Sequence, residues 1–254
     1  MKWANVPSSH TRRRLGAVRP PEKVSEEFSA PVLFCGQIFL FLFMSSPKII
    51  EAKERWARKM AGKEKPAVRS TDRLPPGQHL TGGFPVLDLG IQPEVPLERW
   101  KLEIKGLVEQ PLTLDWPQLN ALEQFADVSD FHCVTTWSKY DCRWSGVAFF
   151  TLVDLVKPQP EARFVYFTGY DGYSTNTALE NCLDDDVLIA TQFDGQPIPK
   201  EHGGPARVII PKLYAWKGAK FVRGIEFRAD DKPGFWEVRG YSNTADPWQE
   251  ERFS

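Results

Sequence analysis

The sequence predicts an α+β fold dominated by mixed or antiparallel β-sheet. Strand-like runs follow one another from residue 99 onward, separated by turn signals such as Asp171-Gly172 and Asp194-Gly195. Helical periodicity is confined to a few short stretches. The chain also holds nine Trp and 21 Pro among its 254 residues, which favours proline-stiffened loops and aromatic rings that fill irregular gaps. A helical bundle is therefore disfavoured.

Each expected element follows from a local pattern. Residues 99–108 (RWKLEIKGLV) alternate between apolar and polar side chains as strands do. Residues 112–122 predict a second short strand and then a helix, whose start is marked by Asp115 or Pro117. Another helix is expected in GVAFFTLVDLV, residues 146–156. Five further strand-like runs complete the series: residues 163–173, 186–198, 206–216, 219–229 and 234–241.

Residues 1–43 do not conform to the composition of the rest of the chain. A basic run, an acidic run and a short apolar stretch at 30–43 follow one another. The apolar stretch is too short to span a bilayer, and Glu22, Glu26 and Glu27 separate it from the basic run, unlike in a secretory signal. We therefore expect translation to start at Met44 and no stable membrane span. An exported or weakly membrane-associated protein is the alternative.

Residues 44–79 are expected to form a basic helix and an extended arm. The helix runs from 46 to about 63, where one amphipathic face is apolar and Gly62 is suited to end it. From 66 to 98 the chain is rich in Pro and Gly with little periodicity, which predicts extended chain lying on the domain. Residues 80–254 are then the main domain.

Charge and cysteine content exclude several classes of protein. The net charge is −1, and the basic excess lies before residue 75, so the main domain lacks the basic surface expected of a nucleic-acid-binding protein. The cysteines lack CxxC spacing, which argues against a zinc site and against a dense disulfide framework. They are Cys35, Cys133, Cys142 and Cys182. A reducing, cytoplasmic compartment fits this pattern best.

Two segments carry residues suited to chemistry. FHCVTTWS, residues 131–138, places the thiol of Cys133 between aromatic residues. A lone buried Cys is ordinarily a small apolar residue, and the alternatives are a nucleophile or a soft-metal ligand. In EHGGPARVIIPKLYAWKGAKFVRGIEF, residues 201–227, two glycines allow the backbone to approach a ligand, and Arg207 offers a planar fork suited to phosphate.

The loop at 216–220 has two interpretations. It could present exposed amide groups and the ammonium groups of Lys217 and Lys220 to an anion. An ordinary hairpin with solvated basic residues explains the same pattern. The segment by itself leaves both interpretations open.

Together these segments resemble the molybdopterin-binding domain of the sulfite oxidase family. The resemblance rests on HCVTTWS, YDGYSTN, LIATQFDGQPIPKEHGGPARVIIPKLYAWKGAK and GFWEVRGYSNTADPW. It covers residues 131–254 closely and extends more weakly, through TGGFPVLDLG and WKLEIKGLVEQPLTL, back to about residue 80. It implies a sulfite oxidase-type fold with surrounding helices and long loops, and a Mo-molybdopterin cofactor. The implied activity is two-electron oxygen-atom transfer on a small sulfur- or nitrogen-containing substrate.

The resemblance also assigns roles to single residues. Cys133 matches the thiolate ligand of molybdenum, and Tyr173 matches an active-site tyrosine, so these are the expected catalytic residues. The positions that match cofactor-binding residues are His202, Arg207, Gly218, Ala219 and Lys220. Nearby residues are expected to be structural: Cys142 and Cys182 as buried thiols, His132 in packing or a backbone hydrogen bond, and Trp137 as a shield of the metal pocket.

The chain departs from sulfite oxidases around the cysteine. TTWSKYDCRW supplies only Lys139 and Arg143 where those enzymes have an Arg-rich stretch, so sulfite is in doubt as the substrate. Reduction of an S-oxide or N-oxide, as in the related methionine-sulfoxide reductases, is the alternative reaction. A non-catalytic molybdopterin-binding protein is the alternative from another class. The resemblance further implies a monomer, because no dimerisation domain follows, and a separate electron-transfer partner, because no haem-binding segment precedes.

Overall fold

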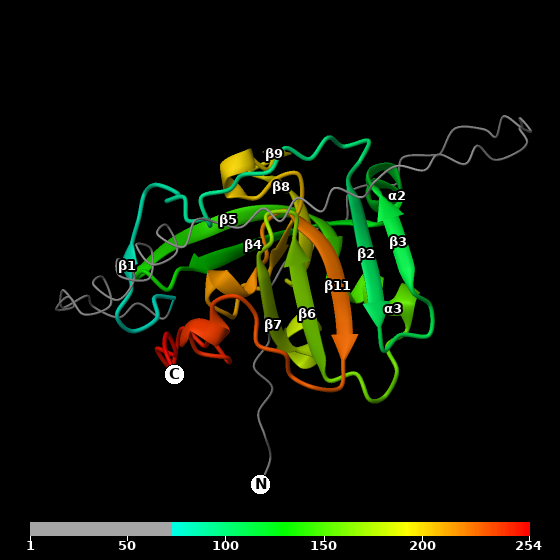
Figure 1. Cartoon of the computed structure of the whole chain (residues 1–254). Helices are drawn as coiled ribbons and strands as arrows, with labels where there is room; N and C mark the ends of the chain where they lie inside the picture. Colours follow the sequence, from blue (N-terminus) through cyan, green and yellow to red (C-terminus); the bar gives the residue numbers. More distant parts are fainter. Residues whose placement is uncertain (1–72) are drawn as a thin grey trace, which may run out of the picture.

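The computed structural model describes residues 73–254, which fold around two β-sheets (Figure 1). The strands are β1 (His79–Leu80), β2 (Lys101–Gly106), β3 (Leu112–Asp115), β4 (Gln124–His132), β5 (Trp137–Ala148), β6 (Phe164–Gly169), β7 (Ser174–Ala178), β8 (Leu188–Phe193), β9 (Gln196–Pro197), β10 (Arg207–Ile209) and β11 (Val222–Arg228). The six-stranded sheet has the order β1-β5-β8-β10, with β4 on β5 and β9 on β8, and the five-stranded sheet has the order β3-β2-β11-β6-β7. Pairs β1–β5 and β2–β11 are parallel and the others antiparallel. The expected α+β class with mixed sheets is confirmed.

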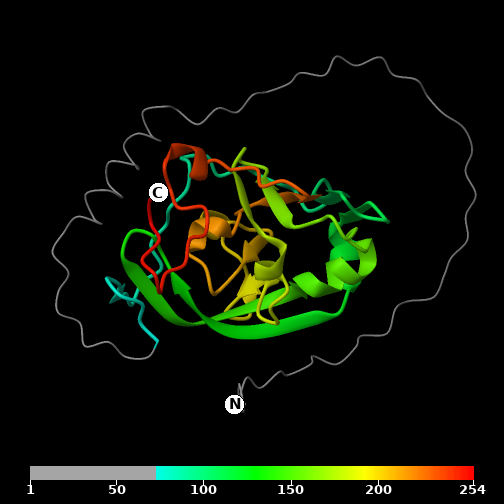
Figure 2. The same ribbon diagram turned by 90° about the horizontal axis from the view of Figure 1, so that it is seen from below.

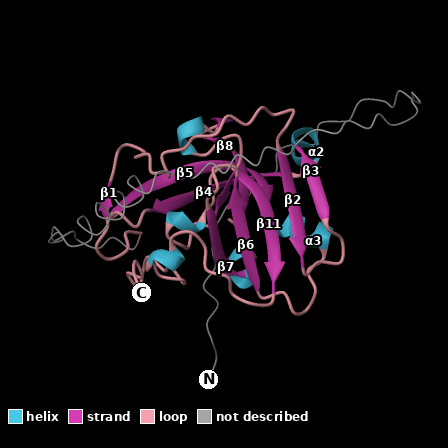
Figure 3. Cartoon of the chain, in the orientation of Figure 1, coloured by secondary structure: helices cyan, strands magenta, loops and turns pink. Residues whose placement is uncertain are grey.

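Helices are short among these residues, as Figure 3 shows. They are α2 (Trp116–Ala121), α3 (Phe149–Val156) and the 3-10 turns η1 (Leu179–Cys182), η2 (Lys200–His202), η3 (Ala215–Lys217) and η4 (Glu237–Arg239). Asp115 caps the start of helix α2: its Oδ1 accepts from the Gln118 amide at 2.8 Å, and Gln118 Oε1 accepts from the Asp115 amide at 2.9 Å. This reciprocal capping box satisfies two backbone donors and fixes the start of the helix.

Three expected elements differ from the structure. Residues 146–148 are the end of β5 and not the first turn of the helix, because they pair with β8. The run 206–216 has three strand residues, after which the chain turns through η3. The strand expected at 234–241 is wrong: this segment forms η4, and its aromatic side chains pack into hydrophobic clusters instead of alternating across a sheet.

The β4–β5 hairpin and strand β7 were not expected from the sequence. Strand β5 is the longest of the described strands, with 12 residues, and Figure 2 shows the hairpin extending along one side of the molecule. At Gly146 the register between β5 and β8 shifts. An added Cβ there would lie 2.1 Å from the Ile189 carbonyl oxygen, so the two backbones can approach this closely only at a glycine.

The largest core cluster joins residues of both sheets and of α3, and it includes Trp100, Leu152 and Phe227. A second cluster surrounds Cys133 and consists mainly of aromatic rings. From 73 to 98 the chain runs over the domain with little regular structure. Among residues 73–254, no helix is long and apolar enough to cross a membrane. The segment 1–43 and the helix expected at 46–63 lie outside the described residues.

Candidate active site

The loop between β4 and β5 holds Cys133 in a tight turn. The Cys133 amide donates to the Trp137 carbonyl at 2.9 Å, and the Thr136 amide donates back to the Cys133 carbonyl at 3.1 Å. Thr136 adopts φ 74° to close the turn, a conformation that β-branched residues rarely adopt and that marks local strain. Two distant side chains fix the loop, because Gln78 Nε2 donates to the Cys133 carbonyl at 3.2 Å and Arg252 Nη1 donates to the Val134 carbonyl at 3.1 Å.

The Cys133 thiol is nearly fully buried and lies 3.2 Å from the Thr135 hydroxyl oxygen. Burial raises the pKa of the thiol, while the Thr135 hydrogen bond and the charge of Arg252 act to lower it. The protein alone therefore favours the neutral thiol. A bound metal cation reverses this preference, because coordination deprotonates the sulfur.

Cys133 lies in the wall of a cavity whose free space is about 890 Å³, counted out to its open mouth. Most of the wall is apolar and aromatic, and its rings are those of Phe84, Phe131, Trp137, Tyr173, Trp216, Trp236 and Tyr241. The charged side chains of the wall are those of Asp88, Asp171, Arg207 and Lys220. A largely apolar cavity with a few polar groups in its wall is the usual form of a cofactor or ligand site.

The structure brings six of the seven expected site residues to this cavity: Cys133, Tyr173, His202, Arg207, Gly218 and Lys220. Ala219 differs, because its methyl group belongs to the main core and its carbonyl accepts from the Val208 amide at 2.9 Å. Trp137 lies in the cavity wall. Cys142 and Cys182 are buried elsewhere.

Arg207 is a buried cation with an incomplete set of partners. Its Nη1 donates to the His202 carbonyl at 2.8 Å, whereas its Nε is buried with no hydrogen-bond partner among the described residues. Its guanidinium lies 5.3 Å from the Phe131 ring centroid, and burial lowers the pKa of Arg207 to about 10. An unsatisfied buried guanidinium is energetically costly, and an anion that accepts from it removes this cost.

His202 and Lys220 lie close to Arg207 in the same wall. The His202 ring stacks on Phe84, with centroids 4.2 Å apart, and burial followed by the charges of Lys220 and Arg207 lowers its pKa. Lys220 Nζ donates to the Glu201 carbonyl at 2.7 Å. At Gly218 an added Cβ would lie 2.5 Å from the Val208 carbonyl oxygen, so this turn requires glycine. The region is cationic and its backbone is closely packed.

The hydroxyl group of Tyr173 forms a hydrogen bond within the protein. The hydroxyl donates to the Trp216 carbonyl, and burial raises the pKa of Tyr173 well above its ordinary value. The phenol therefore stays protonated at physiological pH. Tyr173 therefore lines the cavity with its hydroxyl proton held by the Trp216 carbonyl.

Lys217 corrects one expectation from the sequence. Its ammonium group is not exposed to an anion but is fully buried, 2.8 Å from Glu237 Oε1. Lys217 therefore stabilises the turn η3 from within the protein, and Lys220 is the lysine of this loop that lines the cavity.

His132 does not line the cavity, and its ring Nδ1 lies 2.9 Å from the Ser138 hydroxyl. Burial lowers the pKa of His132 to about 4, so the ring is neutral. The sequence predicts that His132 packs or bonds to the backbone, whereas its ring contacts the Ser138 side chain. This contact, like the expected one, is structural.

Several wall residues were missed in the sequence. Phe84 and Asp88 belong to the arm at 73–98, for which only extended chain was expected, and Asp171 was explained as part of a turn signal. Apart from the weak resemblance of TGGFPVLDLG, no pattern within the arm indicates that it covers a cavity built from later segments.

Comparisons with known proteins agree with this chemistry. A family model described as oxidoreductase molybdopterin binding domain matches residues 89–236. The chain belongs to this family. The uncharacterized oxidoreductase YuiH of Bacillus subtilis (strain 168) is 39% identical over 183 residues, which cover 72% of this chain and 92% of that protein. The protein-methionine-sulfoxide reductase catalytic subunit MsrP of Campylobacter jejuni is 27% identical over 157 residues, 55% of this chain and 52% of that protein.

A solved structure supports the fold. The sulfane dehydrogenase SoxCD from Paracoccus pantotrophus matches with a TM-score of 0.51 and 23% identity, over 55% of this chain and 40% of that chain. The chain thus spans nearly the whole of YuiH but about half of MsrP. As a member of the oxidoreductase molybdopterin-binding domain family, the protein is a molybdopterin-dependent oxidoreductase, and its cofactor is Mo-molybdopterin.

The cavity fits this cofactor in three respects. Cys133 supplies a soft sulfur in the wall, which suits molybdenum. The buried Nε of Arg207 lacks a partner that an anionic phosphate could supply. The aromatic wall suits a flat pterin ring, and Gly218, where no side chain fits, brings backbone into the cavity wall.

Proposed function

We propose that this protein catalyses two-electron oxygen-atom transfer on a small, uncharged sulfur or nitrogen centre, and that reduction of an S-oxide is the favoured reaction. The observation that carries the proposal is the charge of the cavity wall. Its cations are Arg207 and Lys220, and its other charged groups are two carboxyls.

The assignment of the cations leads to the choice of substrate. Arg207 and Lys220 lie with His202 and Gly218, where we assign the pterin phosphate. If both cations serve the phosphate, the wall has no further Lys or Arg to hold an anionic substrate such as sulfite. The carboxyl of Asp88 would repel such an anion, and Asp171 would do so in its ionised form. An uncharged sulfoxide has a polar oxygen and an apolar body. It needs no cation to hold it, the carboxyls do not repel it, and its apolar part suits an aromatic cavity.

In this proposal Cys133 holds the metal through its thiolate, and the cofactor supplies the two-electron oxygen-atom chemistry. The turn closed by Thr136 and the bonds from Gln78 and Arg252 hold the sulfur in one place. Phe84, Trp137 and the neighbouring rings exclude water and bind the apolar part of the substrate. Tyr173 orients polar groups through its oxygen, and the backbone around Ala219 supports the phosphate loop.

The proposal is tested with purified holoenzyme and a reduced viologen dye as electron donor. Dimethyl sulfoxide, methionine sulfoxide and trimethylamine N-oxide are offered as oxidants, and sulfite oxidation is followed with ferricyanide. We expect kcat/KM for at least one sulfoxide to exceed kcat/KM for sulfite by at least about 10-fold, which corresponds to about 1.4 kcal/mol. Faster turnover of sulfite than of every oxide would overturn the choice of substrate. Full molybdenum occupancy without turnover would favour the non-catalytic alternative.

Three further expectations belong to this proposal. We propose a separate electron-transfer protein as the partner, because the two electrons must arrive singly from outside the cavity. We propose a monomer with a cytoplasmic location, and size-exclusion chromatography together with cell fractionation tests both. Recovery in the periplasmic or membrane fraction would favour the exported or weakly anchored alternative. We further propose that the chain divides into an N-terminal segment (1–43), a basic helix with an extended arm (44–79) and the main domain (80–254).

A further inference from the structure

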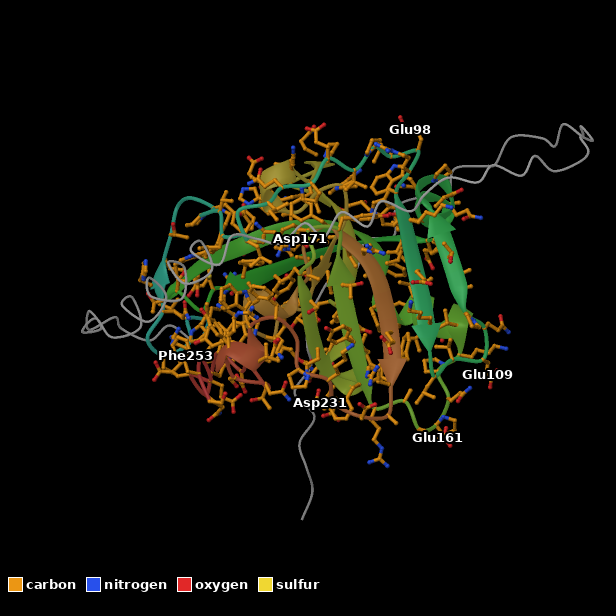
Figure 4. The ribbon with its side chains drawn as sticks, in the orientation of Figure 1. Glu98, Glu109, Glu161, Asp171, Asp231 and Phe253 are labelled. Atoms are coloured by element: carbon orange, nitrogen blue, oxygen red, sulfur yellow. The ribbon has the colours of Figure 1, made fainter. Side chains whose placement is uncertain are left out.

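Asp171 is a buried carboxyl in the wall of the cavity. It follows strand β6, two residues before Tyr173, and it is 3% exposed. In Figure 4 it lies near the middle of the molecule, whereas the labelled Glu98, Glu109 and Glu161 lie at the periphery. Its Oδ1 accepts from the Tyr173 amide at 3.0 Å. An added Cβ at Gly169 would lie 2.3 Å from this oxygen, so a glycine at 169 leaves the space that the carboxyl occupies.

Two charged groups act on Asp171 across the cavity wall. Lys220 lowers its pKa, and Asp88, whose oxygens accept from the Gly90 amide and from Gln92 Nε2, raises it. Burial has the largest effect, and the pKa of Asp171 is raised to about 6. The carboxyl therefore gains and loses a proton close to neutral pH.

Two other groups of the wall, the Tyr173 hydroxyl and the His202 imidazole, are less suited to exchange protons. The Tyr173 hydroxyl is held by the Trp216 carbonyl, and its pKa is raised. His202 stacks on Phe84 beside two cations, and its pKa is lowered. Asp171 alone among these three combines a place in the wall with proton exchange near neutrality.

We propose that Asp171 is a catalytic proton donor, which passes one of the two protons of the reaction to the substrate oxygen. This inference rests on the proposed function. In the reduction, one sulfoxide takes up two electrons and two protons and gives one thioether and one water molecule. The sulfur–oxygen bond breaks, and the oxygen leaves as water with two new O–H bonds. The two electrons come singly from a reduced redox protein. One proton comes from Asp171, which is protonated again from solvent through the open mouth of the cavity, and the other comes from solvent.

The test uses Asp171→Asn in the holoenzyme, with Asp154→Asn as the matched control. Asparagine keeps an oxygen that accepts from the Tyr173 amide but carries no exchangeable carboxyl proton. Asp154 is exposed on α3, which contributes nothing to the cavity wall. A role limited to orienting Tyr173 therefore predicts little change in Asp171→Asn, whereas a role as proton donor predicts a large one.

The first measurement needs no turnover and follows Tm against pH. The pKa of Asp171 is about 6 in the folded protein, above its ordinary value of 3.8. Between pH 4 and 6 the folded wild type therefore binds more protons than the unfolded chain. Its stability falls as pH rises through that window. Asp171→Asn lacks this loss. Its Tm relative to wild type should rise by about 6 to 12 °C between pH 4 and 7. Asp154→Asn should show no such rise, and parallel Tm curves for wild type and Asp171→Asn would overturn the inference.

The second measurement is kcat against pH with a sulfoxide substrate. Wild-type kcat should fall above about pH 6, and Asp171→Asn should lose about 10²-fold or more in kcat together with this break, at unchanged molybdenum content. Asp171→Glu, which restores a carboxyl, should recover activity and a pH break, and it replaces the Asn variant if that variant does not fold. A wild-type rate in Asp171→Asn would overturn the role of Asp171 alone. If wild type reduced no sulfoxide, the proposed function would fall as well.

Discussion

Replacement of Glu237 tests how the turn beneath the cavity is stabilised. Lys217 Nζ lies 2.8 Å from Glu237 Oε1, and the two side chains are 0% and 2% exposed. The same carboxylate oxygen accepts from the Thr175 hydroxyl at 2.8 Å and from the Trp216 indole at 3.2 Å. Glu237→Gln keeps the shape and an acceptor oxygen but removes the negative charge. The variant leaves the ammonium group of Lys217 buried without its counterion.

Two estimates give the free energy of unfolding that Glu237→Gln should lose. Removing one partner of a buried ion pair costs about 3 to 5 kcal/mol. Lys217 can instead lose its proton, and burial already lowers its pKa from 10.5. Holding a lysine neutral at pH 7 costs at most about 5 kcal/mol and at pH 9 about 2 kcal/mol, at about 1.36 kcal/mol per pH unit. We therefore expect a loss of about 3 to 5 kcal/mol in the free energy of unfolding at pH 7, which shrinks to about 2 kcal/mol at pH 9.

Urea unfolding followed by tryptophan fluorescence measures this loss. The control is Glu103→Gln, which removes one partner of the exposed Lys105–Glu103 pair, where both side chains are more than half exposed; its effect should stay below about 1 kcal/mol. Equal effects of Glu237→Gln and Glu103→Gln, or a deficit that grows from pH 7 to pH 9, would refute the reasoning. The double variant Lys217→Met with Glu237→Gln should recover part of the loss, because no unpaired charge remains.

Four further predictions concern the site and the N-terminal segment. Cys133→Ser should keep the fold and lose turnover, because a hydroxyl replaces a soft thiolate; near-normal activity would contradict metal ligation by this residue. Arg207→Ala or Lys220→Ala should weaken cofactor retention by roughly 10-fold to more than 100-fold, given about 1.5 to 3 kcal/mol per charge-assisted hydrogen bond, and full molybdenum occupancy in both would remove the phosphate assignment. Gly218→Ala should lower Tm and molybdenum content together, because the new methyl group meets the Val208 carbonyl at 2.5 Å; unchanged values would show that the turn yields easily. Removal of residues 1–43 should leave activity and solubility unchanged, and aggregation of the shortened protein would count against a start at Met44.

Local patterns predicted the elements that obey one rule along a short stretch. The alternation within residues 99–108 and the cap at Asp115 both appear in the structure, as β2 and α2. The Asp194-Gly195 signal forms a hairpin between β8 and β9, with positive φ at both residues. The cap and the hairpin join neighbours in sequence, so the sequence is sufficient for them; the alternation of β2 predicted the strand but not its pairing with the distant β11.

Elements whose partners lie far away were missed. Strand β5 does not alternate, because both of its faces are covered at its ends, and its burial changes along the strand. Lys217 looks solvated until Glu237, 20 residues later, is placed beside it. Asp171 was fully explained by its turn, so the sequence pattern did not show that it belongs to the cavity wall. The place of Cys133 in a cavity, by contrast, was expected, because the family motif carries long-range information that local periodicity lacks.

The cavity wall is assembled from stretches of chain that begin at residue 84 and end at residue 241. Closing such distant segments on one another is slow and unfavourable until most of the fold is in place. No fragment of the chain therefore contains a binding site for the cofactor, and insertion must wait for nearly complete folding. Once bound, the cofactor stabilises only that folded state, by mass action. The amount of this protein that a cell retains should accordingly follow its supply of molybdopterin.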